Sequence, residues 1–197
     1  MKSPSLNLKD SMEFFHTYMY APLQGKRHIY EDRGIRLGTA VAASDWEVLA
    51  SLLVGSKGNG GVSGVDLGDF EVKSVLGDAG YEYQYHKETG VQKLKKDATV
   101  GHLFFNHINF LNKIELRYVH GVKAKKEHFD VWAKNYPNPY PQRYRNSISF
   151  GWAKKNAKLL LVIENGKVVL NASWLFINRV HSLFHDYELP ALFQQRF

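Results

Sequence analysis

The sequence predicts a protein of the α/β class, because strong helix signals and strong strand signals alternate along it. Residues 44–54 carry apolar side chains at helical spacing, whereas residues 81–86 and 113–120 alternate apolar with polar side chains, as half-buried strands do. The pair Asn165-Gly166, between two apolar runs, is a strong hairpin signal. No internal repeat, long linker or low-complexity tail divides the 197 residues, of which 44% are hydrophobic, so we expect one domain over residues 1–197.

The first expected helix covers residues 10–20. Its apolar side chains fall on one stripe, and Asp10 or Ser11 can cap its first turn. Pro22 and Gly25 are expected to end it, because proline and glycine both interrupt helices.

The second expected helix covers residues 44–54. Ser44 and Glu47 have the spacing of a Ser-x-x-Glu capping box, in which each side chain binds a free backbone N–H group at the helix start. The expected apolar face consists of Val48, Leu49, Leu52 and Leu53.

Four further elements are expected in the second half of the chain. Residues 159–163 and 167–170 read as the two strands of a hairpin. Short helices are expected at residues 127–134 and near residues 175–184.

A glycine-rich loop follows the second helix, with five glycines in residues 55–64. Such a loop is commonly a flexible surface segment. It can also let backbone N–H groups and Lys57 approach a phosphate. It is not a Walker A loop, because no Ser or Thr follows Lys57.

The composition restricts the partners and the chemistry. The formal net charge is +7 and the pI is near 9.4, which suits a polyanionic partner or simply a basic protein. Cysteine is absent, which excludes disulfides, zinc-thiolate sites and a cysteine nucleophile. There is no signal-peptide pattern and no apolar run of about 20 residues, the length needed to span a bilayer, so a cytoplasmic protein is expected.

The pattern that carries chemistry lies at residues 66–73. In a strand, Glu71 and Lys73 point to one face, while Phe70 and Val72 point to the other. A nearby aspartate completes a set of two carboxylates and one ammonium. Such a set can hold Mg²⁺ and activate water against a phosphodiester.

Two aspartates compete to be the first carboxylate of this set. Asp69 has the same parity as Glu71 and Lys73, so a straight strand places it on their face. Asp66 has the opposite parity and reaches that face through a bulge at Gly68 or through a bend in the strand.

The order of helix, glycine-rich loop and Asp66, Glu71 and Lys73 on a strand resembles the PD-(D/E)xK nuclease superfamily. This superfamily includes most type II restriction endonucleases and the MutH mismatch-repair nickase. The resemblance covers about residues 44–120, the expected catalytic core, and Val65 stands where the family often has proline. Residues 121–197 are then expected to complete the domain and recognise DNA.

The resemblance implies a mixed β-sheet flanked by helices and a Mg²⁺-dependent mechanism. Asp66 and Glu71 correspond to the metal ligands, and Lys73 to the lysine that positions or deprotonates the attacking water. The family spacing favours Asp66 over Asp69. Glu47 is a further candidate ligand, since some members place a helix glutamate near the metal, although its capping-box role explains it without any metal and is preferred.

Basic side chains are the candidates for DNA contact. Lys123, Lys125 and Lys126 are expected at phosphates, together with Lys57. Arg143 and Arg145, expected in a loop after the proline-rich run, are the candidate base readers, because arginine can bond two guanine acceptors. For any single one of these side chains, an ordinary solvated surface is the favoured interpretation.

The nine histidines offer two weaker metal patterns. His102 and His107 lie in a segment with superficial similarity to the His/Asn nucleases. His181 and His185 are four residues apart on an expected helix, without an evident third ligand.

These observations predict a Mg²⁺-dependent endonuclease acting on duplex DNA, of the type II restriction kind and homodimeric. One alternative is a nuclease of the same fold that acts on RNA or on branched or damaged DNA. The other is a non-catalytic nucleic-acid-binding module, in which the strand with Glu71 and Lys73 is only a charged face.

Overall fold

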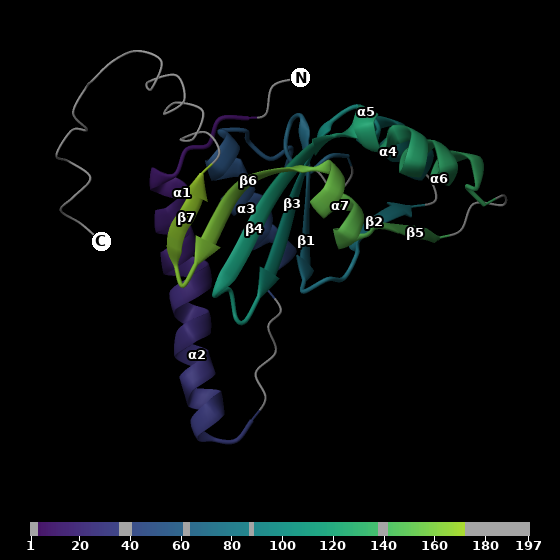
Figure 1. Cartoon of the computed structure of the whole chain (residues 1–197). Coiled ribbons are helices and arrows are strands. Elements are labelled where there is room, and N and C mark those ends of the chain that lie inside the picture. Colours follow the sequence, from purple (N-terminus) through teal and green to yellow (C-terminus); the bar gives the residue numbers. More distant parts are fainter. Residues whose placement is uncertain (1–3, 36–40, 61–63, 87–88, 138–141, 172–197) are drawn as a thin grey trace, which may run out of the picture.

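A five-stranded mixed sheet organises the chain, with helices on both of its faces (Figure 1). The computed structural model describes residues 4–35, 41–60, 64–86, 89–137 and 142–171. The helical elements are α1 (Lys9–Phe14), the π-helix η1 (Phe15–Tyr20), α2 (Ala21–Asp32), α3 (Ala43–Val54), α4 (Gly90–Asp97), α5 (Gly121–Ala124), the π-helix η2 (Lys125–Phe129), α6 (Asp130–Lys134) and α7 (Phe150–Asn156). The strands are β1 (Phe70–Leu76), β2 (Tyr81–His86), β3 (Gly101–Ile108), β4 (Lys113–His120), β5 (Arg143–Ile148), β6 (Lys158–Glu164) and β7 (Lys167–Asn171).

The main sheet has the order β1-β3-β4-β6-β7, and β1 lies at one edge. β1 pairs with β3 in parallel, and the other neighbours pair in antiparallel fashion. The parallel pair requires a crossover, which contains β2 and α4. β2 pairs with β5 in a separate two-stranded sheet. The expected α/β fold with a mixed sheet is thereby confirmed.

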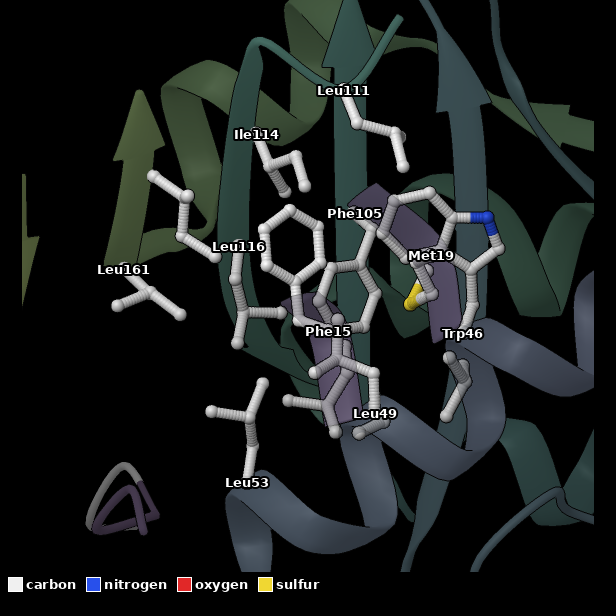
Figure 2. Packing of buried hydrophobic residues seen from close by; sticks show 14 of the residues in the cluster. Phe15, Met19, Trp46, Leu49, Leu53, Phe105, Leu111, Ile114, Leu116 and Leu161 are labelled. Carbon is white, nitrogen blue, oxygen red and sulfur yellow. The ribbon is translucent and has the colours of Figure 1, made fainter. Parts of the chain in front are cut away.

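A hydrophobic cluster lies on each face of the main sheet, and β3 contributes to both. Leu103 and Phe105 point into one cluster and Phe104 into the other, because alternate residues of a strand face opposite sides. The first cluster joins the sheet to η1 and α3 and includes Phe15, Met19, Trp46, Leu49, Leu53, Phe105 and Leu116 (Figure 2). The second joins the sheet to β2, α4, η2 and α6 and includes Tyr81, Tyr83, Tyr85, Leu94, Phe129 and Trp132.

The N-terminal helical stretch is longer than expected. It continues through Pro22 and Gly25 to Asp32, so the prediction that these two residues end it is wrong. Pro22 lies in the first turn of α2, directly after η1. A proline is tolerated in a first helical turn, where its missing N–H group leaves no hydrogen bond unmade.

The second helix lies where it was expected, but its start differs. Ala42 is the N-cap of α3 and no side chain caps the helix, so the predicted capping box of Ser44 and Glu47 is wrong. Trp46 is buried while Val48 is 42% exposed, because the face toward the sheet is rotated from the predicted one. Glu47 is therefore free of the capping role.

Several other expectations are confirmed. The strands at residues 81–86 and 113–120 are β2 and β4, and the hairpin turn between β6 and β7 has positive φ at Asn165 and Gly166. The helix expected at residues 127–134 begins earlier, as η2 and α6. The segment with Arg143 and Arg145 is the strand β5 and not a loop, which corrects that prediction.

The helix expected near residues 175–184 lies outside the described residues, as do His181 and His185. Within the described part of the chain, no helix combines the length and the apolar character needed to cross a membrane.

Candidate functional site

A tight turn before β1 brings Asp66 beside the strand. The N–H group of Leu67 donates to the carbonyl oxygen of Phe70 at 2.9 Å, and the N–H of Phe70 donates back at 2.7 Å. The chain thus reverses over Gly68 and Asp69, and an Oδ2 atom of Asp66 accepts a hydrogen bond of 2.8 Å from the N–H of Val72. Asp66 therefore reaches the face of Glu71 through a turn and not through a bulge. Asp69 is exposed at the tip of the turn, and none of the ion pairs or hydrogen bonds of the cluster involves its side chain.

Glu71 is the centre of the cluster, and its side chain is completely buried. Its Oε1 atom accepts hydrogen bonds from the ammonium groups of Lys73 and Lys93, each at 2.6 Å. Its Oε2 atom is buried and has no hydrogen-bond partner among the described residues. Burial raises the pKa of Glu71, but the two ammonium groups outweigh burial and hold the pKa below its ordinary value.

Lys73 links the two carboxylates. Its ammonium nitrogen lies 2.6 Å from Glu71 Oε1 and 3.7 Å from Asp66 Oδ2. Burial alone lowers the pKa of Lys73, but Glu71 and Asp66 raise it to about 12. Burial also raises the pKa of Asp66, against the opposing effect of Lys73. In this arrangement Lys73 carries a positive charge at neutral pH.

Lys93 and Asp97 belong to the cluster, although the motif at residues 66–73 does not include them. They lie four residues apart on α4, with the ammonium nitrogen of Lys93 3.2 Å from Asp97 Oδ1. Tyr85 donates a hydrogen bond of 3.0 Å to Asp97 Oδ2. Burial and the charge of Glu71 raise the pKa of Asp97 to about 7. The only signal was the Lys-x-x-x-Asp spacing, and nothing local shows that this face of α4 covers β1.

A buried histidine extends this network beneath Glu71. His102 is the β3 neighbour of Glu71 in the sheet. Its Nε2 atom lies 2.8 Å from the carbonyl oxygen of Asp97, and its Nδ1 atom lies 2.7 Å from the hydroxyl of Tyr83. A carbonyl only accepts, so Nε2 carries the proton and Nδ1 accepts from Tyr83. Burial lowers the pKa of His102 to about 4, which keeps the ring neutral.

Glu47 faces the same site from α3. It lines a cavity of about 220 Å³ together with Lys73, Ser74 and Glu82. Burial and the nearby charge of Asp66 raise the pKa of Glu47. Because β1 is an edge strand, α3 on one face and β2 on the other both reach the site at its open edge. The structure thus brings Glu47 to Asp66, Glu71 and Lys73.

The donor set fits Mg²⁺ in an open site. Among the described residues, no group of three or more His, Cys, Asp or Glu side chains is placed to hold a metal ion. Mg²⁺ does not require one, because it commonly keeps several waters and takes one or two carboxylates from the protein. The ligands would be the carboxylate of Asp66 and the Oε2 atom of Glu71, which has no hydrogen-bond partner among the described residues, with Glu47 at the edge.

The predicted DNA-contacting residues divide into two groups. Lys57 precedes the turn at Asp66, and its carbonyl oxygen accepts a hydrogen bond of 3.3 Å from the N–H of Gly68. Arg145 lies 3.7 Å from Glu82, which lines the cavity, and Arg143 is exposed at the start of the same strand.

The second group consists of Lys123, Lys125 and Lys126, which lie on α5 and η2. Lys123 donates to the carbonyl oxygen of Asn156 at 2.6 Å, and Lys125 pairs with Asp130 at 3.5 Å. Lys123 and Lys125 therefore contact groups on α7 and α6 and not the carboxylate cluster.

The two histidines of β3 do not meet. His102 belongs to the Tyr83 network, whereas His107 stacks on Trp46 on the opposite face, with ring centroids 5.0 Å apart. The His/Asn nuclease pattern considered for them is therefore not formed.

No family model matches the chain, and a search of curated proteins finds no match either. The residues of the site and their geometry therefore carry the functional argument.

Proposed function

We propose that this protein is a Mg²⁺-dependent endonuclease that hydrolyses phosphodiester bonds in duplex DNA, in the manner of type II restriction enzymes. The observation that supports this most is the convergence of Asp66, Glu71 and Lys73 at an open sheet edge, where the buried Oε2 atom of Glu71 has no hydrogen-bond partner among the described residues. An orphaned buried carboxylate oxygen costs free energy unless a ligand, such as a cation, occupies it when the protein works.

The chain's own residues divide the work as follows. Asp66 and Glu71 hold the metal, which when bound would neutralise charge on the phosphate and make the attacking water more acidic. Lys73 keeps its proton, so it donates hydrogen bonds and orients the attacking water or a phosphate oxygen. Lys93 holds Glu71 from the other side, and Asp97 and Tyr85 fix Lys93 in turn.

The test compares cleavage and binding of duplex DNA in the wild-type protein and in Lys73→Ala. With Mg²⁺, and not with EDTA, the wild-type protein is expected to cut the DNA, and Lys73→Ala is expected to lose cleavage by at least about a thousandfold while still binding. Lys113→Ala is the matched control, because Lys113 is a strand lysine that pairs with the exposed Glu164 outside the site. Undiminished cleavage in both Lys73→Ala and Glu71→Gln contradicts the proposal.

One observation favours a second candidate. Two ammonium groups on one carboxylate oxygen are also what a purely structural ion-pair cluster contains. On that alternative the protein is a non-catalytic nucleic-acid-binding module, with salt-sensitive binding and no metal-dependent turnover. Parallel cleavage assays on RNA and on branched DNA distinguish a nuclease of other specificity from the duplex-DNA endonuclease and from the non-catalytic module.

A further inference from the structure

A second cleft lies at the end of the sheet where β4 stops. It has a volume of about 490 Å³, within the usual range of ligand pockets. Tyr118, His120 and Val122 contribute to its wall, together with Lys123 and Lys158. None of the catalytic candidates lines it, so it is distinct from the cavity at Glu47 and Lys73.

Exposed lysines line this cleft. Lys123 and Lys158 line it, and the hydrogen bond from Lys123 to Asn156 joins α5 to the end of α7. The same two helical segments carry four more exposed lysines, Lys125, Lys126, Lys154 and Lys155. Of the acidic side chains on these segments, Asp130 pairs with Lys125, and Glu127 accepts a hydrogen bond from Trp152. The cleft wall therefore carries two ammonium groups, with four more on the adjoining helical segments, and suits an anionic ligand.

The rings in the wall are held in place. Tyr118 packs edge-on against Phe70, with centroids 6.3 Å apart, and both rings lie over Gly101, where an added Cβ would come within 2.8 Å of each. His120 accepts a hydrogen bond of 3.3 Å at Nδ1 from the N–H of Val122, so its neutral ring carries the proton on Nε2. The cleft thus combines an aromatic face with N–H groups that can donate hydrogen bonds to a phosphate.

The cleft and the candidate active site share one end of the sheet. β1 and β3 begin there, β4 ends there, and Phe70, Gly101 and His120 are neighbours in the sheet (Figure 1). Glu71 follows Phe70 directly, but its side chain points to the other face. A nucleic acid that passes over this sheet end can therefore contact both places.

We propose that this cleft binds an unpaired nucleotide in a single-stranded segment of nucleic acid, with its base on Tyr118 and its phosphates at Lys123 and Lys158. The inference rests on the proposed function for the class of ligand, which is nucleic acid. Stacking on an aromatic side chain needs an accessible base face, and the faces of bases inside a duplex are covered by their neighbours. The ligand of this cleft is accordingly a single-stranded segment and not an intact duplex.

The test measures binding of a short fluorescein-labelled single-stranded oligodeoxynucleotide, and of the matching blunt duplex, by fluorescence anisotropy. The protein carries Lys73→Ala and the buffer contains EDTA, so no cleavage interferes. Tyr118→Leu is expected to weaken single-strand binding about tenfold and to leave duplex binding unchanged, whereas Tyr118→Phe keeps the ring and the affinity.

The lysines are tested in the same assay. Lys123→Gln with Lys158→Gln is expected to weaken single-strand binding about tenfold and to reduce the slope of log affinity against log salt by about 1.4, the value for two lost phosphate contacts. The matched control is Lys26→Gln with Lys167→Gln, which removes equal charge from exposed positions on α2 and β7.

Three results would overturn the inference. One is equal single-strand affinity in Tyr118→Leu and Tyr118→Phe. Another is a loss of single-strand affinity in the Lys123→Gln and Lys158→Gln variant that is no larger than the loss in the control pair. The third is a concentration-dependent dimer in sedimentation that dissociates in the lysine variant, which would make a second copy of the chain the occupant. These results are distinct from a failure of the proposed function, which would appear as the absence of Mg²⁺-dependent cleavage by the protein with Lys73 intact.

Discussion

Asp66 and Asp69 show how a single turn selects one of two similar carboxylates. The reversal over Gly68 and Asp69 places Asp66 3.7 Å from Lys73 and leaves Asp69 exposed. We expect Asp66→Asn to reduce plasmid cleavage at least about a hundredfold, because the metal loses a charged ligand, and Asp69→Asn to remain within about twofold of wild type. Asparagine at position 66 can still accept the hydrogen bond from Val72, so circular dichroism should show an intact fold. Initial cleavage rates decide, and equal losses in both variants would contradict the assignment.

The second prediction concerns His107 and the stability of the folded protein. Burial lowers the pKa of His107 to about 4, below the ordinary 6.5, so the folded protein holds the neutral ring. Between about pH 6.5 and pH 4, His107 is protonated in the unfolded chain but neutral in the folded protein. The stability that this group contributes is therefore fully present above about pH 6.5 and is lost as the pH falls toward 4. The loss amounts to about 3 kcal/mol. His107→Phe keeps a ring against Trp46, and urea unfolding between pH 4 and 7 should show a slope smaller by up to about 1.4 kcal/mol per pH unit. An unchanged slope would show that the ring is already charged in the folded state.

At the scale of elements, the packing of α4 beside β2 completes the site, because it brings a helix lysine to the buried carboxylate of β1. The helix carries Lys93 to 2.6 Å from Glu71, and Asp97 and Tyr85 hold Lys93 there. We expect Lys93→Met to reduce cleavage by about 10- to 100-fold, as loss of a supporting contact to a metal ligand does, and Lys93→Arg to restore part of it.

The neighbouring Lys95→Met serves as the control for α4, because Lys95 is exposed on the same helix. A purely structural role for Lys93 would lower the urea midpoint without changing the Mg²⁺ concentration needed for half-maximal cleavage. A positioning role raises that concentration, so this readout separates the two.

The elements also show which parts of the fold are readable from sequence. The alternation in β2 and β4 and the Asn165-Gly166 turn are local signals, and the structure follows them. Glu71 and Lys73 share a face for the same local reason. Lys93, in contrast, reaches Glu71 through a crossover between parallel strands, and no spacing along the chain encodes that contact. The continuation of the N-terminal helices past Pro22 likewise depends on the change from η1 to α2, which composition does not reveal.

At the scale of the whole molecule, the chain carries one set of Asp66, Glu71 and Lys73. One such set hydrolyses one strand, so cutting both strands in a single binding event needs two copies, and a palindromic site favours two copies related by a two-fold axis. We therefore expect the wild-type protein to convert supercoiled plasmid to the linear form without accumulating the nicked form.

Mixing tests this directly, because an excess of Lys73→Ala protein forms mixed dimers with one competent site each. At a fixed concentration of wild-type protein, rising amounts of the variant should shift the product from linear to nicked plasmid. The control is the same excess of Lys113→Ala protein, whose site is intact and which should therefore leave linear plasmid as the product. A Lys73→Ala variant that also lacks DNA binding is then not needed as a second control. If the Lys73→Ala protein leaves the ratio of products unchanged and only slows the reaction by competing for DNA, the enzyme cuts as a monomer. The two outcomes differ because a mixed dimer has one working cluster, which cuts one strand and leaves the other intact. An inactive monomer that competes for DNA instead lowers cleavage of both strands equally.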